Sequence, residues 1–232
     1  MKKSSILILI IICLVGCKKG SNETTITGEI KGLGTDTLYL YGMDELYDRI
    51  DTIYVENDKF SYTTSVDTIT SAYLLLKNRI EYPVFLDKGN KIKIKGDTIN
   101  LNFLTISGNI YNEEFTDFQK ALEDPADPSE KAGEETVDKR ITVEKANTAE
   151  EMAEEFILQH HSSYVSLYLL DKYFVQKETP DFSKIKKLVE VMTGVLQDKP
   201  YIERLNETIT QAEKSEIGKY APFFSLPNAK GE

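Results

Sequence analysis

Thiol, imidazole and indole side chains are scarce or absent in this chain. Its 232 residues include two cysteines, two histidines and no tryptophan. Both cysteines, Cys13 and Cys17, lie in the first seventeen residues, so the remainder offers no disulfide and no cysteine-ligated metal site. The two histidines, His160 and His161, are adjacent. Adjacent side chains on a helix point about 100° apart, so the pair is a poor zinc site, and a helix end or a loop is favoured.

The charge balance is acidic. Asp and Glu outnumber Lys and Arg by 38 to 28, which gives a formal net charge of −10. Nucleic-acid phosphates bind clustered Lys and Arg, so this balance argues against a nucleic-acid partner. It also argues against binding anionic lipid through the protein surface.

Motifs for metal, phosphate or nucleophilic chemistry are also missing. Glu150, Glu151, Glu154 and Glu155 form a dense carboxylate run without the Glu-x-x-His of di-metal sites, which predicts a solvated helix face. Residues 32–34, Gly-Leu-Gly, precede no helix start and predict a turn, not a phosphate loop. Without Gly-x-Ser-x-Gly, nucleophilic hydrolysis has no support. We therefore expect no catalytic residue, no metal and no other cofactor. The thirteen tyrosines indicate sheet packing, with a sugar-stacking platform as the alternative.

The N-terminus combines a positive head, residues 1–3, with an apolar run over residues 4–15. This run has about twelve residues, whereas a membrane-spanning helix needs roughly twenty, so a removable signal peptide is predicted over residues 1–16. Leu14-Val15-Gly16-Cys17 resembles the lipobox of bacterial lipoproteins. The resemblance implies that Cys17 becomes the N-terminus and carries acyl chains. The alternative is that Cys17 is an apolar residue beside a conventional cleavage site.

Lipidation at Cys17 would fix the location and the chemistry of the mature chain. Removing 16 of 232 residues leaves 216, and losing Lys2 and Lys3 changes the net charge from −10 to −12. Residues 17–24 are short and polar, which predicts a lipid-anchored tether. We expect an envelope protein of a Gram-negative-type bacterium, facing the periplasm from the outer or inner membrane. Because Cys17 is consumed as a thioether, this chain is expected to have no redox catalysis.

Short alternating segments at intervals of roughly ten residues predict a β-rich domain over residues 25–108. Turn residues at 56–59 predict a hairpin between two of these segments. The evenly apolar residues 71–76 predict a central strand, and Pro83 predicts an edge strand or a strand end. The expected architecture is an antiparallel β-sandwich or barrel. Its strands are predicted at 25–30, 37–41, 50–55, 60–64, 71–76, 82–86, 91–95 and 101–106.

At residue 109 the hydrophobic period changes, and a helical region is predicted over residues 109–216. One helix is expected at 109–122, and another begins at Thr148, with Glu151 in the capping-box position. Ser162 or Ser163 caps a third, residues 182–196 form a fourth, and Pro200 opens a fifth. Short loops favour antiparallel helix hairpins. The predicted fold class is therefore α+β, a β-sandwich followed by an α-helical hairpin region.

Residues 217–231, IGKYAPFFSLPNAKG, resemble the opening of a thioredoxin-like module of the peroxiredoxin and cytochrome-maturation type. Phe223 stands where that family usually has Asp. Residues 28–33 with 38–41 resemble the β-rich domain of unknown function in lipoprotein thiol–disulfide oxidoreductases, and residues 156–170 resemble their helical middle. The resemblance implies that residues 217–232 begin a thioredoxin-like domain. The family's Cys-x-x-Cys has no counterpart here, so a truncated oxidoreductase or a stand-alone lipoprotein is expected.

These observations predict a non-catalytic, lipid-anchored accessory region that positions a redox module or binds a protein partner. A second hypothesis is that the full-length gene product is a thioredoxin-like oxidoreductase whose catalytic domain is missing from these residues. A third is a ligand-binding lipoprotein, with its site on the sandwich face or in the groove between sheet and helices. A deep apolar pocket with converging polar groups would favour the third hypothesis.

Overall fold

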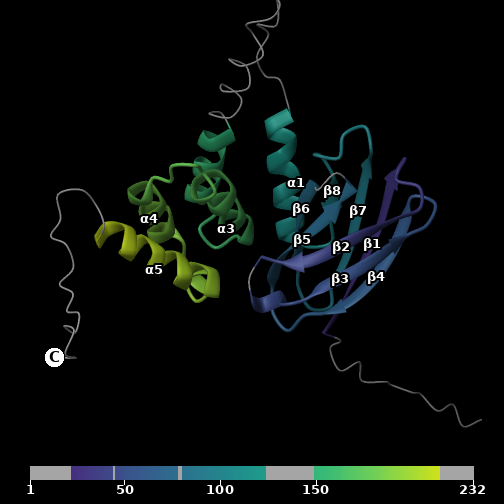
Figure 1. The fold of residues 1–232 in the computed structure, drawn as a ribbon, viewed down its shortest axis with the longest axis horizontal. Coiled ribbons are helices and arrows are strands. Elements are labelled where there is room, and N and C mark those ends of the chain that lie inside the picture. Colours follow the sequence, from purple (N-terminus) through teal and green to yellow (C-terminus); the bar gives the residue numbers. More distant parts are fainter. Residues whose placement is uncertain (1–21, 44, 78–79, 124–148, 215–232) are drawn as a thin grey trace, which may run out of the picture.

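The computed structural model of the chain describes residues 22–43, 45–77, 80–123 and 149–214 (Figure 1). The predicted signal peptide, the lipidation of Cys17, the cap at Thr148 and the thioredoxin-like opening at 217–232 all lie outside these residues. Within the described ranges, every helix is too short or too polar to cross a bilayer.

Eight strands form two four-stranded sheets. Sheet A has the strand order β4-β1-β7-β8, and sheet B has the order β3-β2-β5-β6. All neighbouring strands are antiparallel except β1 and β7, which are parallel. The α+β prediction is confirmed, and the two sheets do not close into a barrel. The strands are β1 (Glu23–Lys31), β2 (Asp36–Gly42), β3 (Ile50–Val55), β4 (Lys59–Ser65), β5 (Thr70–Leu76), β6 (Ile80–Leu86), β7 (Lys91–Asp97) and β8 (Thr105–Ser107).

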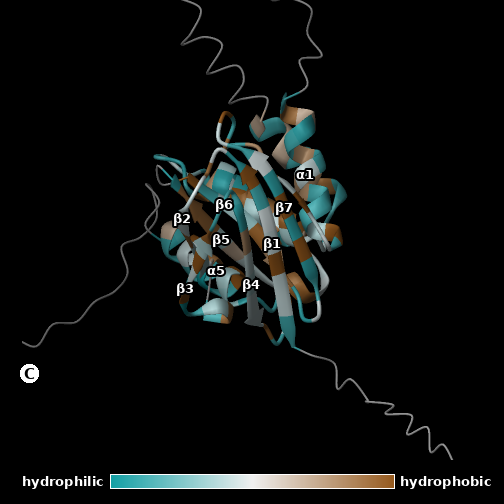
Figure 2. Ribbon diagram, turned by 90° about the vertical axis from the view of Figure 1, so that its right-hand side faces the viewer, coloured by the Kyte–Doolittle hydropathy of each residue, from teal (hydrophilic) through white to brown (hydrophobic). Residues whose placement is uncertain are grey.

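Alternating side chains on these strands build the core. In β7, Ile92 and Ile94 are buried while the lysines on either side of them are exposed. Figure 2 shows hydrophobic and hydrophilic residues alternating along β1 and β7. Burial of one Ile or Leu side chain stabilises the fold by about 1.5–3 kcal/mol. The buried side chains of the sheets and of the helices form one continuous cluster, so the two halves of the chain share a core.

The turn between β3 and β4 links the two sheets. Asn57 and Asp58 have φ angles of 51° and 69°, and residues Glu56 and Lys59 exchange both backbone hydrogen bonds at 2.9 and 3.1 Å. Positive φ at both central residues is the type I′ geometry that hairpins favour. The predicted turn is therefore present, but the predicted hairpin does not extend, because β3 continues in sheet B and β4 in sheet A.

Helix α1 (Ile110–Glu123) joins the sheets on the opposite side of the sandwich, where β6 and β8 are edge strands. The Asn112 side chain accepts a hydrogen bond from the Phe85 N–H at 3.0 Å and donates one to the Phe85 carbonyl at 2.8 Å. One turn later, the Thr116 hydroxyl accepts from the Ile106 N–H and donates to the Ile106 carbonyl, both at 3.0 Å. Two buried polar side chains of one helix thus provide hydrogen-bond partners for backbone groups of Phe85 and Ile106, on the edge strands of the two sheets.

The remaining helices lie on the side of sheet B that faces away from sheet A, and α3 contacts β5 directly. Ser163 caps α3, as predicted, because its hydroxyl accepts from the Val165 N–H at 3.2 Å. On α3, Tyr168 packs against Tyr73 of β5 with ring centroids 6.2 Å apart. The helical elements are residues 149–159, α3 (Tyr164–Leu170), the π-helical turn η3 (Asp171–Val175), α4 (Phe182–Val191), the 3-10 turn η4 (Gly194–Leu196) and α5 (Pro200–Lys214).

Two predicted elements are wrong in extent. The helix predicted at 182–196 ends at Val191, because Met192 and Thr193 are extended and Gly194 has a φ of 63°, outside the helical range. The strand predicted at 101–106 is reduced to the three residues of β8, since the preceding segment turns through hydrogen bonds from Asn100 to Asp97 and from Phe103 to Asn100. Pro83 lies in edge strand β6 and residues 71–76 in central strand β5, as predicted.

Candidate interaction surface

The helices leave part of sheet B uncovered, and large apolar side chains gather there. Tyr39, Ile50 and Tyr54 are exposed by 42%, 73% and 74%. The register pairs Tyr41 with Ile50, Tyr39 with Thr52 and Thr37 with Tyr54, which places these side chains on one face. We call Tyr39, Tyr41, Ile50 and Tyr54 the β2–β3 face. Exposed apolar side chains grouped in this way mark interaction sites more often than isolated ones do.

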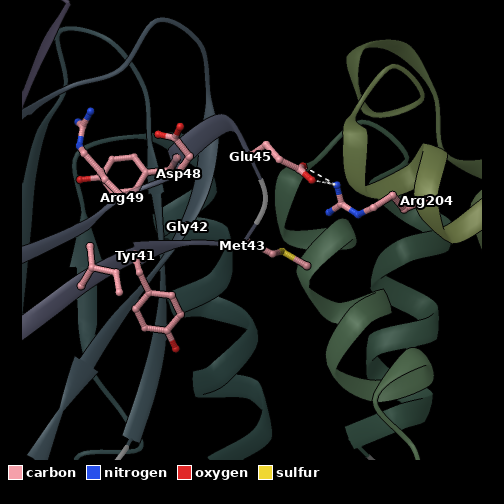
Figure 3. A pocket seen from close by; sticks show the side chains of 9 residues that line it. Tyr41, Gly42, Met43, Glu45, Asp48, Arg49 and Arg204 are labelled. Atoms are coloured by element: carbon pink, nitrogen blue, oxygen red, sulfur yellow. Dashed lines mark hydrogen bonds and ion pairs between the residues drawn. The ribbon is translucent and has the colours of Figure 1, made fainter.

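A hollow of about 490 Å³ adjoins the β2–β3 face, between the end of β2, the following loop with the 3-10 turn η1 (Glu45–Tyr47), and α5 (Figure 3). Glu45 and Arg204 point toward each other across it and form an ion pair. Hydrogen bonds from Arg204 lower the pKa of the exposed Glu45 carboxyl. Met43 and Arg49 also line the hollow. The site is therefore an apolar strand surface with a charged rim.

A hydrogen-bond network holds the loop behind this hollow. The Tyr47 hydroxyl donates to Asp51, and Arg49 donates to Asp51 at 3.2 Å and to the Ser65 carbonyl at 2.9 Å. Burial acts to raise the pKa of Asp51, but hydrogen bonds from Tyr47, Tyr62 and Arg49 outweigh it and hold the pKa below its usual value. The Arg49 guanidinium lies 4.6 Å from the centre of the Tyr47 ring. These contacts hold the described residues of the loop, 45–49, against β3 and β4.

On its other side, the β2–β3 face meets a tyrosine-rich contact with the helices. Asp171, the first residue of the π-helical turn, accepts hydrogen bonds from the Tyr201 hydroxyl at 2.5 Å and from Gln176 at 2.6 Å. Burial and the Asp171 carboxylate raise the pKa of Tyr201. Tyr41 packs against Tyr73 with ring centroids 5.6 Å apart. Burial and the nearby Glu81 raise the pKa of Tyr41. The first contacts join α5 to the π-helical turn, and the second lies within sheet B, where Tyr73 also packs against Tyr168 of α3.

Comparison with protein families identifies the first half of this architecture. Residues 24–115 match the family model described as a domain of unknown function (DUF4369). Residues 24–115 are a DUF4369 domain. The DUF4369 domain contains all eight strands except the first residue of β1, together with the first residues of α1, including Asn112, which accepts the hydrogen bond of the Phe85 N–H in β6. The predicted resemblance to a β-rich domain of unknown function is confirmed to that extent. No curated protein and no solved structure matches the chain.

A second, more enclosed cavity of about 280 Å³ lies between β6 of the DUF4369 domain, α1 and α3. Five aromatic side chains line it, and one of them, Tyr82, donates a hydrogen bond to the Leu104 carbonyl at 2.7 Å. Polar side chains from three elements also line it. The lining includes Tyr82, Phe115, Phe118, Tyr168 and Tyr173, with Glu81, Gln119 and Lys172. The cavity lies between sheet and helices, and its walls carry both aromatic and polar side chains.

The two histidines lie at a helix end, as predicted. His160 follows helical residues 149–159, and its ring stacks on Phe156 at 4.0 Å. The His161 carbonyl accepts a hydrogen bond from Thr193 at 3.0 Å. Among the described residues, no three His, Cys, Asp or Glu side chains come together as a metal site.

The carboxylate run differs from its prediction as a solvated face. Glu151 and Glu155 are exposed, but Glu150 and Glu154 are partly buried and form ion pairs. Lys184 lies 2.7 Å from Glu154 and 3.4 Å from Glu150, and Lys177 lies 2.5 Å from Glu150. Two of the four carboxylates therefore join the helical residues 149–159 to α4 and the turn before it.

Sequence reasoning missed the β2–β3 face, although β3 carried a signal for it. Ile53 and Val55 occupy the buried side of this strand, which accounts for its alternation. Ile50 and Tyr54 add apolar side chains on the opposite side, where a solvated strand would be polar. Apolar residues on both sides indicate either a covered sheet or a surface that binds something.

Proposed function

We propose that this chain is a lipid-anchored, non-catalytic interaction region of a cell-envelope protein of the thiol–disulfide oxidoreductase type. The observation that carries the interaction role is the β2–β3 face, where Tyr39, Ile50 and Tyr54 are exposed together beside a charged hollow. An apolar, tyrosine-rich centre with a polar rim is the usual composition of a protein interface. Strands already ordered by the sandwich core lose little conformational entropy on binding.

The lipobox at Cys17 supports the anchored location, and residues 217–231 support the redox context, since they resemble the opening of a thioredoxin-like module. We propose that the face binds a redox module of this kind or its protein client. Under this proposal the chain holds and presents its partner, and the electrons pass through the partner's cysteines.

Mass spectrometry of membrane-extracted protein tests the anchor. The expected N-terminal peptide begins at Cys17 and carries acyl chains on sulfur, and it is lost in Cys17→Ser. An unmodified thiol at Cys17 would refute the lipidated location. An insulin-reduction assay of the same material tests the non-catalytic role, because turnover without an added redox protein contradicts it.

Site-specific photo-crosslinking in cells tests the face. A photoreactive residue at position 54, on the β2–β3 face, is expected to yield a crosslink to a polypeptide that contains Cys-x-x-Cys. The matched control is position 63, an exposed Thr on the outer face of sheet A. Ile50→Lys should abolish the crosslink while leaving the circular dichroism spectrum unchanged. Equal crosslinking from positions 54 and 63, or a crosslink unaffected by Ile50→Lys, contradicts the proposed interface.

The aromatic cavity favours a second candidate function, binding of a small apolar ligand. A volume of about 280 Å³ accommodates a one- or two-ring molecule. Indole is a suitable probe because the chain contains no tryptophan, so indole emission reports on the probe alone. A blue shift of that emission in the presence of the protein, lost in Leu122→Phe, which fills the partly buried rim of the cavity, supports the ligand site. An unchanged emission spectrum excludes it for this class of ligand.

A further inference from the structure

The outer face of sheet A is covered by lysines and hydroxyl groups. Lys91, Lys93 and Lys95 of β7 are exposed on this face because the isoleucines between them point into the core. The parallel register places them beside Thr25, Thr27 and Glu29 of β1. On the other side of β1, strand β4 continues the same face with exposed hydroxyl side chains at Ser61 and Thr63.

Charge is segregated between this face and the rest of the chain. Strand alternation puts five lysines on the outer face of sheet A against three carboxylates, whereas the whole chain has a net charge of −10. Glu29 lies between Lys59 and Lys95, which are its partners in the register on either side. The lysines are 31, 59, 91, 93 and 95, and the carboxylates are Glu23, Glu29 and Asp97.

The lysines of β7 are available for an external anion. Among the ion pairs of the described residues, none involves Lys91, Lys93 or Lys95. Ammonium and hydroxyl groups are all hydrogen-bond donors, and phosphate oxygens are strong acceptors. A surface that carries such donors therefore suits a layer of phosphate groups. The acidic net charge of the whole chain argues against binding to anionic lipid, but the outer face of sheet A carries more lysines than carboxylates.

The first strand of the chain, β1, belongs to sheet A. Strand β1 begins at Glu23, six positions after Cys17. An extended chain spans at most about 3.5 Å per residue, so a lipid on Cys17 keeps the start of β1 within about 21 Å of the bilayer. Because β7 runs parallel to β1, Lys91 lies beside Thr25, near the anchored end. Screening limits attraction to roughly 8 Å at physiological salt, and the tether permits an approach this close.

We propose that the outer face of sheet A rests on the anionic phospholipid headgroups of the bilayer that carries the acyl anchor. This inference rests on the proposed lipid anchor at Cys17. It assigns an orientation to the anchored protein: sheet A faces the membrane, and the β2–β3 face, on the outer side of sheet B, faces the partner. Each lysine at an anionic surface favours this orientation roughly fivefold.

Fluorescence quenching on the lipidated full chain tests the orientation. Residues 18–232 contain no cysteine, and Cys17 is acylated under this proposal, so Ser61→Cys on sheet A and Thr52→Cys on sheet B each accept one bimane label. The labelled proteins are reconstituted into phosphatidylcholine vesicles with or without phosphatidylglycerol, and both contain a lipid with a nitroxide on its headgroup. We expect quenching at position 61 only, only with phosphatidylglycerol, and weakened by salt.

Charge variants separate docking by the lysines from anchoring by the lipid. The triple variant K91Q/K93Q/K95Q is expected to weaken docking roughly 100-fold and to abolish quenching at position 61. The matched control K172Q/K186Q/K187Q removes three exposed lysines of the helical region and should leave quenching unchanged. An unquenched label at position 61, or quenching unaffected by the β7 variant, overturns the orientation alone. An unacylated Cys17 in mass spectrometry overturns the anchor, and the orientation with it.

Discussion

Replacing Asn112 with Leu should destabilise the whole sandwich, because the Asn112 side chain is the hydrogen-bond acceptor of the buried Phe85 N–H on the edge of β6. Asn112 is 1% exposed and accepts the hydrogen bond of the Phe85 N–H. Leucine has nearly the same shape but offers no acceptor, so the Phe85 N–H would remain buried and unpaired. The Phe85 carbonyl keeps its hydrogen bond from Asn109 at 2.8 Å, so in the variant only the Phe85 N–H is left without a hydrogen-bond partner.

A buried unpaired donor costs about 1–3 kcal/mol, and the lost hydrogen bond from Asn112 to the Phe85 carbonyl adds roughly 1 kcal/mol. We therefore expect Asn112→Leu to lower the free energy of unfolding by about 2–4 kcal/mol, a large part of the 5–15 kcal/mol typical of a domain. Thr116→Val is its counterpart at β8, where the Ile106 N–H and carbonyl both lose their partner. The double variant should lose less than the sum, because both side chains act through one helix.

Urea unfolding followed by far-UV circular dichroism measures these differences, with tyrosine fluorescence as a second probe. Asp117→Leu is the matched control, since it lies on the exposed side of α1 and its ion pair with Lys120 is largely solvated. The control should stay within about 0.5 kcal/mol of the unsubstituted chain. If Asn112→Leu also stays within that range, α1 does not hold the edges of the sheets as described.

Three further outcomes are expected. Gly28→Ala should lower the free energy of unfolding by about 1–3 kcal/mol, because the added Cβ would overlap the Phe60 ring. In a double-mutant cycle of urea midpoints, Phe60→Leu should relieve that loss. Ser163→Ala should cost roughly 1 kcal/mol by removing the cap of α3, whereas Ser162→Ala, at an exposed position, should cost little in the same assay. Burial raises the pKa of several tyrosines in the folded state, so the unfolded chain loses those protons first as the pH rises. The free energy of unfolding should therefore keep its full value below pH 10 and fall above it, and phenolate absorbance follows the titration. A urea-unfolding midpoint that does not change between about pH 10 and 12 would be the contrary result. The tyrosines are Tyr41, Tyr47, Tyr73, Tyr82, Tyr168 and Tyr201.

Local patterns predicted the elements better than their partners. The alternation of Lys and Ile in residues 91–95 is enough to define a strand with one buried side. It does not reveal that this strand pairs in parallel with β1, since that depends on how the chain returns to the same sheet. Likewise, the turn at residues 56–59 was predictable from its residue types, but the divergence of β3 and β4 into different sheets was not.

The sequence alone did not identify either surface of the sandwich, for related reasons. Net charge is a sum over the chain and carries no position, so a total of −10 concealed a face with an excess of lysines. The apolar residues on both sides of β3 left open a covered sheet or a binding surface, because the exposure of Ile50 and Tyr54 depends on where the helices stop covering sheet B.

By itself, the sequence determined the α+β class, most strand and helix positions, a cap at Ser162 or Ser163 and the turn at residues 56–59, because each depends on neighbours within a few residues. Only the tertiary structure decided that α1 hydrogen-bonds backbone groups on an edge strand of each sheet, that lysines from three strands share the outer face of sheet A, and that the β2–β3 face stays uncovered. These features arise from contacts between residues distant in sequence, whose pairing is set by the packing of the whole core.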